Sequence, residues 1–495
     1  MSGIARVTAC ALWGLETELV TVEVDVSSGL PGFDVVGLPD SAVREARERV
    51  RAAIRNSGFE FPLRRITVNL APAERRKEGT GFDLAIALAI LRASGQLLVA
   101  VSELCVGELG LDGAVRPVRG VLPRARRAVG AGIPGALVAG QNAAEAAAAG
   151  SEAIAVDTLR AAVCHLEGTV RLAPAARPPL PDAPAWEVDL GDIVGQETPK
   201  RALEIAAAGG HNLLLIGPPG TGKTLLAQAL PSILPPLDED EAMAASVVHS
   251  VAGLVDPGRP LLRARPFRAP HHTASRLSLV GGGTPPRPGE VSLAHTGALF
   301  LDELAQFSPQ VLDTLREPLQ EGRITISRAG TSATYPARFT LIAAMNPCPC
   351  GKLGDSATPC TCLPDAIDRY NGRISGPLLD RLNLRVHVPR VPYEALRDGR
   401  AHERSSDVRR RVLTARARMT ARGCRANSEL TPAELRRHCS LDGPAEELLG
   451  RAVQDRRLSA RAYHRILRVA RTMADLEESD GVRRDHLASA LLLRA

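Results

Sequence analysis

The stretch Gly217-Pro218-Pro219-Gly220-Thr221-Gly222-Lys223-Thr224 decides how the central part of this 495-residue chain folds. An apolar run, Asn212 to Ile216, leads into it, and a helical pattern, Leu225 to Leu230, follows it. This order of strand, glycine-rich turn and helix matches the phosphate-loop pattern, in which backbone N–H groups and a helix N-terminus point at phosphates. We expect a nucleotide site here, with Lys223 reaching the β- and γ-phosphates and Thr224 binding Mg²⁺.

A second motif favours hydrolysis over binding alone. The apolar strand Ala298 to Leu301 ends in Asp302 and Glu303. In a phosphoryl-transfer site, Asp302 would hold Mg²⁺ through water, and Glu303 would orient and deprotonate the attacking water. An Asp-Glu pair by itself more commonly begins a helix, so this prediction depends on the phosphate loop.

Together these motifs resemble the magnesium-chelatase-like branch of AAA+ ATPases over residues 187–495, and the whole chain resembles the YifB/ComM family. Ile193-Val-Gly-Gln196 resembles the segment that wraps the adenine, which makes Val194 a candidate contact. Asn346 follows the apolar strand Phe339 to Ile342 and resembles the sensor that contacts the γ-phosphate or the water.

The same resemblance implies two catalytic arginines. Gly376-Pro-Leu-Leu-Asp-Arg381 resembles the arginine-finger segment, and Leu458-Ser-Ala-Arg461 resembles the second sensor of a helical lid. A guanidinium from a neighbouring subunit would stabilise the charge that develops on the γ-phosphate. Arg373 is a rival for either role, and in so arginine-rich a chain any one of these residues is also an ordinary surface arginine.

Two stretches resemble insertions. Pro266 to Glu290 resembles the insert within helix 2, and Gly322 to Arg338 is typical of a β-hairpin. In this branch such hairpins face the central pore of a hexamer, so Arg323, Arg328 and Arg338 are candidate contacts to nucleic acid phosphates. The alternative is that they are solvated hairpin charges.

Four of the nine cysteines fall within fifteen residues: Cys348, Cys350, Cys360 and Cys362. Four thiolates close a tetrahedral, structural Zn²⁺ site, which Lys352 would favour by stabilising thiolates. The alternatives are redox disulfides and unligated thiols, and similar clusters occur in the ComM-like family. For the adjacent pair His271-His272, whose side chains diverge, we expect a structural or hydrogen-bonding role rather than a metal site.

The composition is that of a folded protein, with 45% hydrophobic and 23% charged residues. The net charge is only +6, from 61 basic and 55 acidic residues, and lysine occurs only at positions 77, 200, 223 and 352. Arginine-rich stretches are therefore weak evidence for nucleic acid binding. Because no apolar run is long enough for a membrane span and no signal peptide is present, we expect a cytoplasmic protein.

The region before the phosphate loop ends in a proline-rich linker, Arg171 to Trp186. Arg76-Lys-Glu-Gly-Thr-Gly81-Phe-Asp83 and Gly107 to Val118 resemble the Lon-protease fold. Gly81 stands where that fold has its serine nucleophile and Leu122 where it has its lysine base, so we expect no proteolysis. The short run Ala143 to Ala149 is predicted to be a surface helix.

We therefore predict an α/β protein in four parts: a Lon-protease-like α+β domain (1–170), the linker (171–186), an AAA+ core with the cysteine cluster at 348–362 (187–392) and a helical lid (393–495). The resemblance implies an ATPase, working as a hexamer with ATP, Mg²⁺ and structural Zn²⁺, that moves along single-stranded or branched DNA as a branch-migration helicase. The alternatives are a chelatase-like ATPase that remodels a protein partner and an ATP-dependent protease.

Overall fold

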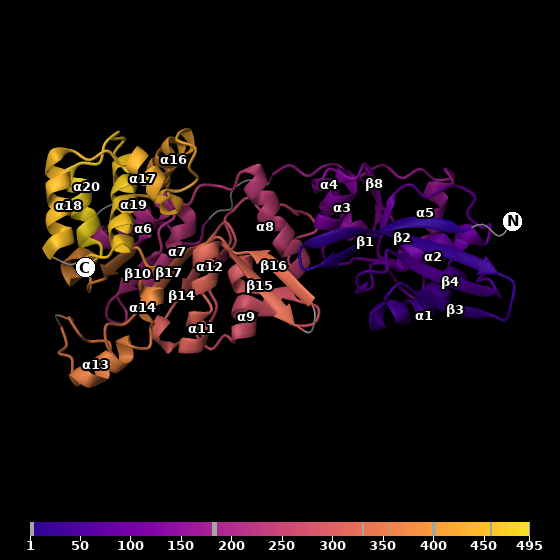
Figure 1. Ribbon diagram of the computed structural model, residues 1–495, viewed down its shortest axis with the longest axis horizontal. Helices are drawn as coiled ribbons and strands as arrows, with labels where there is room; N and C mark the ends of the chain where they lie inside the picture. Colours follow the sequence, from indigo (N-terminus) through magenta and orange to yellow (C-terminus); the bar gives the residue numbers. More distant parts are fainter. Residues whose placement is uncertain are drawn as a thin grey trace.

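The computed structural model describes residues 4–180, 186–328, 331–355, 357–397, 402–455 and 458–494. They form an elongated molecule, with the N-terminal part at one end and the last helices at the other (Figure 1). A seven-stranded and a five-stranded sheet organise it. This agrees with the expected α/β class, with a parallel sheet and a helical C-terminal region.

The N-terminal part holds the seven-stranded sheet. Its elements are β1 (Ala5–Trp13), β2 (Glu16–Ser27), β3 (Gly32–Val36), α1 (Ser41–Asn56), β4 (Arg65–Ala71), α2 (Asp83–Ala93), β5 (Leu104–Val106), β6 (Glu108–Leu109), β7 (Val115–Arg116), α3 (Val121–Gly130), β8 (Gly135–Val138), α4 (Gly140–Ala148), β9 (Glu152–Ala155) and α5 (Leu159–Leu166). The strand order is β3-β4-β2-β1-β5-β8-β9. β1 and β2 are antiparallel, and β5, β8 and β9 run parallel. The sheet is therefore mixed.

The prediction of a surface helix at Ala143 to Ala149 was wrong. Residues 140–148 form α4, but Ala143, Ala146, Ala147 and Ala148 are all buried. Their short side chains let α4 pack closely on β8, β9 and α3, so a run of alanines here marks tight packing rather than exposure.

The central part holds the five-stranded sheet. Its elements are η1 (Leu190–Asp192), α6 (Glu197–Gly209), β10 (Leu213–Ile216), α7 (Lys223–Ile233), α8 (Glu239–Ala252), β11 (Phe267–Arg268), α9 (Arg276–Val280), β12 (Gly281–Gly282), β13 (Arg287–Pro288), α10 (Glu290–Leu293), β14 (Ala298–Leu301), η2 (Leu304–Gln306), α11 (Pro309–Asp313), α12 (Arg316–Glu321), β15 (Arg323–Arg328), β16 (Thr331–Pro336), β17 (Thr340–Met345), α13 (Pro364–Asn371), α14 (Gly376–Leu379) and β18 (Leu384–His387). The order is β11-β14-β17-β10-β18, and every pairing is parallel. The carboxyl ends of β10, β14 and β17 therefore meet at one edge, where ligands bind in open α/β sheets.

The C-terminal part is helical. Its elements are α15 (Tyr393–Arg397), α16 (Ser405–Ala421), η3 (Asn427–Glu429), α17 (Pro432–His438), α18 (Gly443–Asp455), α19 (Ala460–Leu476) and α20 (Arg484–Leu492). α19 packs on α6, α16 and α20, and its buried Arg471 pairs with Asp475 at 2.9 Å. The helices thus share one apolar core with the five-stranded sheet.

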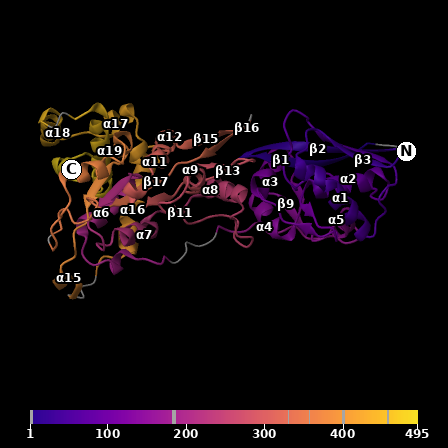
Figure 2. The same cartoon turned by 90° about the horizontal axis from the view of Figure 1, so that it is seen from below.

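The expected hairpin forms as β15 and β16. Ile324, Ile326, Ala333 and Tyr335 from it pack against Val280 at the end of α9, and Leu15 from the β1–β2 turn covers the same cluster. Both views show this hairpin beside β1 and β2 (Figures 1 and 2). The hairpin therefore joins the two large sheets.

A second contact between the N-terminal and central parts lies at α8. The Ser250 hydroxyl donates to the Glu145 carboxylate on α4, and the Gly120 backbone N–H donates to the Ser250 carbonyl at 3.1 Å. Within the described ranges, no helix has the length and apolar character needed to cross a membrane.

Candidate nucleotide-binding site

The predicted phosphate loop connects β10 to α7 at the carboxyl edge of the five-stranded sheet. Gly220 and Gly222 have φ of 75° and 87°, which favours glycine. Gly222 is the N-cap of α7, and none of the described side chains caps that helix. The first backbone N–H groups of α7 are therefore available to an anion.

Lys223, the first residue of α7, is held by neutral acceptors. Its Nζ donates to the carbonyl oxygens of Gly217 and Pro218, both at 2.8 Å, and to Oδ1 of Asn346 at 3.2 Å. Burial lowers the pKa of Lys223. The ammonium group thus bridges the phosphate loop and the candidate sensor on β17.

Asp302 and Glu303 follow β14 directly. Oδ2 of Asp302 accepts from the Thr224 hydroxyl at 2.6 Å, and Oδ1 accepts from the Glu303 backbone N–H at 2.8 Å. Glu303 has φ of 51°, a left-handed conformation that residues other than glycine rarely adopt outside special sites. A hydroxyl and a carboxylate at this distance fit Mg²⁺, which prefers oxygen ligands.

These residues share one cleft of about 520 Å³. Its lining includes Pro219, Gly220, Thr221, Gly222, Lys223, Thr224, Asp302, Glu303 and Asn346. The structure thus brings the phosphate loop, the acidic pair and the candidate sensor together, although they follow three different strands of the sheet.

The segment expected to wrap the adenine lies between η1 and α6. Val194 is half-buried. Buried Gln196, at φ of 60°, donates through Nε2 to the carbonyl oxygens of Thr221, at 3.2 Å, and Pro389, at 2.7 Å. Gln196 therefore ties the phosphate loop to the segment after β18, and Val194 lies two residues from that tie.

Arg381 and Arg461 lie in a different place. They line a second cavity, of about 730 Å³, between the five-stranded sheet and the last helices, and no described residue of 217–224 lines it. Eight arginines line this arginine cavity: Arg265, Arg338, Arg381, Arg416, Arg425, Arg461, Arg465 and Arg468. Burial and the guanidinium groups of Arg316 and Arg461 lower the pKa of Arg381. The lining also contains Glu321, Asp380 and Glu429. Three of the arginines are already ion-paired, Arg265 and Arg425 with Glu241 and Arg465 with Asp380.

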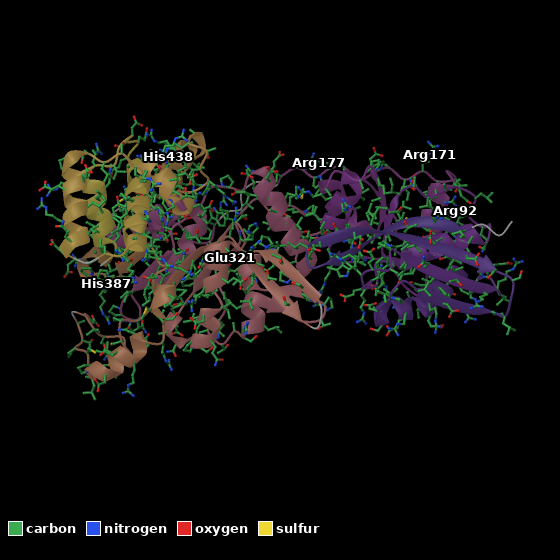
Figure 3. The ribbon with its side chains drawn as sticks, viewed as in Figure 1. Arg92, Arg171, Arg177, Glu321, His387 and His438 are labelled. Atoms are coloured by element: carbon green, nitrogen blue, oxygen red, sulfur yellow. The ribbon has the colours of Figure 1, made fainter. Side chains whose placement is uncertain are left out.

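Neighbouring side chains fix the Arg381 segment. Nη2 of Arg381 donates to Oε1 of Gln320 at 2.5 Å, and Nη1 of Arg381 donates to the Pro377 carbonyl at 2.8 Å. Arg465 of α19 pairs with Asp380 at 3.2 Å. Gln320 precedes Glu321, which Figure 3 labels at the end of α12, where the hairpin begins.

Arg373, the alternative candidate for the two arginine roles, lies near Glu303 rather than in the arginine cavity. Its Nη1 donates to the Ala305 carbonyl at 3.1 Å, two residues after Glu303. Arg373 is exposed and is not among the described residues that line the arginine cavity. It belongs to the Glu303 side of its own subunit.

The four clustered cysteines come together after β17. All four sulfur atoms lie within 4.8 Å of one another, and Cys348, Cys350 and Cys360 are separated by 3.5 to 3.6 Å. A tetrahedral site with Zn–S bonds of about 2.3 Å requires sulfur separations of about 3.8 Å, so the cluster fits Zn²⁺. Hydrogen bonds from the Lys352 backbone, and also from Cys362, Thr361 and Cys348, lower the pKa of Cys350 to about 6. Burial and neighbouring thiols raise the pKa of Cys360 and Cys362.

The cysteine loop touches the phosphate loop. A Cβ at Gly351, whose φ is 78°, would lie 2.8 Å from Cδ of Pro219. Only glycine fits this approach, and a displaced cysteine loop would displace Pro219.

The candidate DNA-contacting arginines do not lie together. Arg323 begins β15, is exposed and pairs with Glu321 at 3.3 Å. Arg328 ends β15, and its side chain lies outside the described part, as do residues 329 and 330. Arg338 lines the arginine cavity at the base of the hairpin.

In the N-terminal part, the two positions compared with a protease dyad hold no such chemistry. Leu122 is fully buried. A Cβ at Gly81 would lie 3.1 Å from Nη1 of buried Arg124, so a guanidinium fills the space beside the missing serine side chain.

Sequence reasoning missed two contacts. Nδ1 of His272 lies 3.2 Å from Oε2 of Glu303. This agrees with the expected hydrogen-bonding role for the histidine pair, but the sequence did not identify Glu303 as the partner. Gln320, which holds Arg381, carried no sequence signal. Both contacts join segments distant in sequence, so only the fold reveals them.

Comparison with protein families covers nearly the whole chain. A family described as "Magnesium chelatase, subunit ChlI" matches residues 189–396. "Subunit ChlI of Mg-chelatase" matches residues 22–142, and "Magnesium chelatase, subunit ChlI C-terminal" matches residues 402–494.

Individual relatives extend this comparison. The chain is 46% identical to the YifB protein of Salmonella typhimurium, over 99% of this chain and 97% of that protein. It is 45% identical to the competence protein ComM of Haemophilus influenzae, with the same coverage of 99% and 97%. It is 27% identical to the magnesium-chelatase 38 kDa subunit of Rhodobacter capsulatus, over 60% of this chain and 83% of that subunit.

Proposed function

The chain belongs to the YifB/ComM family of magnesium-chelatase-like AAA+ ATPases, and on this basis we propose that it is a ring-forming ATPase that moves along single-stranded or branched DNA. The ring is a hexamer of identical subunits. The DNA substrate is proposed from the resemblance to the YifB/ComM family, which includes competence protein ComM at 45% identity.

One observation supports the proposal that the subunits assemble into a ring. The phosphate loop, Asp302 and Glu303 line one cleft, whereas Arg381 and Arg461 line a separate cavity. This separation supports a site that two subunits complete, because within one subunit the proposed arginines do not line the phosphate-loop cleft. In many phosphoryl-transfer enzymes, an arginine supplied by another subunit or protein stabilises the charge on the transferring phosphoryl group.

In this proposal the subunit that binds ATP supplies positioning and the base. Backbone N–H groups of 220–224 and Lys223 hold the phosphates, and Asn346 orients the γ-phosphate or the water. Glu303 accepts the proton of the attacking water. Thr224 and Asp302 hold Mg²⁺, which supplies neutralisation of phosphate charge when bound.

The neighbouring subunit supplies Arg381 and Arg461. The Asp380–Arg465 pair at 3.2 Å links the finger segment to α19, the helix that carries Arg461. A movement of the helical lid therefore displaces both arginines together, which couples nucleotide state in one subunit to lid position in the next.

The hairpin is the proposed DNA contact, with Arg323 and Arg328 gripping phosphates in the central pore. Arg338 lies at its base among the residues of the arginine cavity, so its DNA role is the least supported of the three. The contact would be blind to base sequence and weakened by salt.

The cysteine cluster is proposed to hold structural Zn²⁺. Four thiolates leave no open position, and the Gly351–Pro219 approach gives the cluster a bracing role beside the phosphate loop. The N-terminal part, residues 1–170, is proposed to be a Lon-like domain without proteolytic activity, because Gly81 and Leu122 provide neither nucleophile nor base.

A chelatase-like ATPase that remodels a protein partner is the second candidate, favoured by the 27% identity to a magnesium-chelatase subunit. The two differ in one measurement, the ATPase rate with single-stranded, duplex and branched DNA. The DNA motor requires stimulation by DNA, and the remodelling ATPase requires none.

The hairpin variant Arg323→Ala/Arg328→Ala sharpens this test. It should abolish DNA-stimulated hydrolysis and strand movement while basal ATPase remains, because neither side chain is expected to touch nucleotide. Arg436→Ala/Arg437→Ala, two exposed arginines on α17, is the matched control. If neither single-stranded nor branched DNA binds at low salt with ATP present, the DNA motor is excluded.

A further inference from the structure

Helix α1 carries a stripe of four exposed arginines, Arg44, Arg47, Arg51 and Arg55, which we call the α1 stripe. At 100° per residue the four positions fall within about 80° of one another around the helix. The opposite face buries five apolar side chains against the seven-stranded sheet: Val43, Ala46, Val50, Ala53 and Ile54. The stripe therefore faces away from the core.

None of the four guanidinium groups forms an ion pair with a carboxylate among the residues that the structure describes. They rest on neutral groups instead. Arg44 donates to the Pro39 carbonyl at 3.5 Å and Arg47 to the Phe33 carbonyl at 3.4 Å. Arg51 and Arg55 lie over the Phe61 ring, at 5.7 and 6.0 Å from its centroid. The charges are held in place without being neutralised.

Arg49, on the same helix, differs from the four stripe arginines because it has a carboxylate partner. It points inward and forms a 2.7 Å ion pair with buried Asp83. Composition explains why arginine rather than lysine stands at each position, but it does not explain why the inward arginine has a carboxylate partner and the outward four do not.

The two flanks of the stripe differ in charge. Glu45 and Glu48 lie on one side, about 100° and 40° around the helix from Arg44. Arg47 contacts β3 on the other side, where exposed Arg64 and Arg65 precede and begin β4. Two more exposed arginines thus lie near the stripe at the start of β4, together with exposed Asp34 of β3.

We propose that the α1 stripe binds the phosphate backbone of nucleic acid, as a second contact besides the hairpin. The choice of DNA as the ligand rests on the proposed function. The location of the site rests only on the arginines of α1 and their contacts. From Arg44 to Arg55 the stripe rises about 16 Å, at 1.5 Å per residue, which spans about five phosphates of one strand at 3.4 Å spacing. A repeating polyanion fits such a row better than a single phosphate group.

The place of α1 in the molecule suits this role. In Figure 1, α1 lies in the N-terminal part, on the side of the elongated molecule toward which the hairpin strands β15 and β16 slope, whereas Figure 2 shows the hairpin at one edge and α1 set back from that edge. The N-terminal part touches the hairpin through Leu15. The N-terminal part that carries α1 thus lies next to the hairpin.

The test uses the full-length protein and a labelled mixed-sequence DNA, as single strand and as duplex, titrated between about 50 and 200 mM salt. The stripe variant changes Arg44, Arg47, Arg51 and Arg55 to Gln. Its affinity for duplex should fall about tenfold or more, and the slope of log affinity against log salt should shrink by up to about 3.6, because each phosphate that an arginine neutralises contributes about 0.9.

Two matched variants make the result specific. The charge control changes four other exposed arginines to Gln, Arg126, Arg127, Arg436 and Arg437, and should bind DNA within about twofold of wild type. A version of the stripe with four lysines keeps the charge and should keep most of the affinity.

The proposal is overturned, with the DNA motor left standing, if the stripe variant binds like wild type, if the charge control weakens binding as much, or if the lysine version fails as badly as the glutamine version. If wild type binds anionic lipid vesicles through the stripe and binds no DNA, both the proposal and the DNA motor are excluded.

Discussion

Replacing Arg381 by Ala tests whether this ATPase builds its site from two subunits. In one subunit Arg381 lies among the residues of the arginine cavity, apart from the phosphate loop. Its removal should leave ATP binding intact and lower hydrolysis about 10³- to 10⁵-fold, the range for an arginine finger, which corresponds to about 4–7 kcal/mol of transition-state stabilisation.

Mixing gives a quantitative signature. An Arg381→Ala subunit keeps Lys223, and a Lys223→Ala subunit keeps Arg381, so an interface between them in one order is intact. With random assembly the fraction of intact interfaces is the product of the two subunit fractions, which peaks at about one quarter in an equal mixture, whatever the ring size. Activity should therefore follow a parabola in mixing ratio, from near zero at both ends.

The assay is steady-state phosphate release at saturating ATP, with co-assembly verified by affinity capture of a tag on one variant. Arg373→Ala serves as the comparison, because Arg373 contacts Ala305 on the Glu303 side of its own subunit, and we therefore expect no rescue in trans. Mixtures that co-assemble and show no rescue would refute the reasoning, and rescue of Arg373→Ala by Lys223→Ala would transfer the finger role to Arg373.

Three further predictions follow from single sites. Glu303→Gln should retain ATP binding and lose turnover by orders of magnitude, since the carboxylate that accepts the water proton is gone; a wild-type rate would remove Glu303 from that role. Purified protein should contain about one zinc per chain by metal analysis, and Cys348→Ser or Cys360→Ser should lower thermal stability more than nucleotide affinity; well-folded, reduced, metal-free protein would exclude the site. Burial lowers the pKa of His211 from 6.5 to about 3, so below pH 6.5 the unfolded chain takes up a proton that the folded chain refuses, and His211 alone should lower stability by about 1.4 kcal/mol between pH 7.5 and 5.5. His211→Gln should flatten that part of the profile of unfolding temperature against pH, and an unchanged slope would assign it to other groups.

Much of the cleft could be predicted from the sequence because each of its parts combines a strand with a chemical motif. Parallel strands bring their carboxyl ends to one edge, so the residues after β10, β14 and β17 had to meet. The strand Ala298–Leu301 begins and ends where the apolar pattern indicated.

The errors and omissions have a different physical origin. Alanine periodicity carries no information on which neighbours press against a helix, so α4 was expected at the surface and is buried. The contacts of His272 with Glu303 and of Gln320 with Arg381 depend on segments that meet only after folding. No local pattern specifies such pairs.

The arginines show how structure adds to composition. In a chain where nearly every cation is arginine, the residue type alone says little. The structure sorts the same residue into different environments: Arg471 is buried against Asp475, Arg381 shares a cavity with other arginines, and the α1 stripe faces solvent beside carbonyls and an aromatic ring. An arginine that pairs with a buried carboxylate attracts other anions weakly, because the carboxylate cancels most of its electric field. An arginine without such a partner remains available to bind an anion from outside the chain. Removing a paired arginine should therefore cost stability, whereas removing Arg381 or the stripe should leave the fold intact and change what the protein binds or hydrolyses.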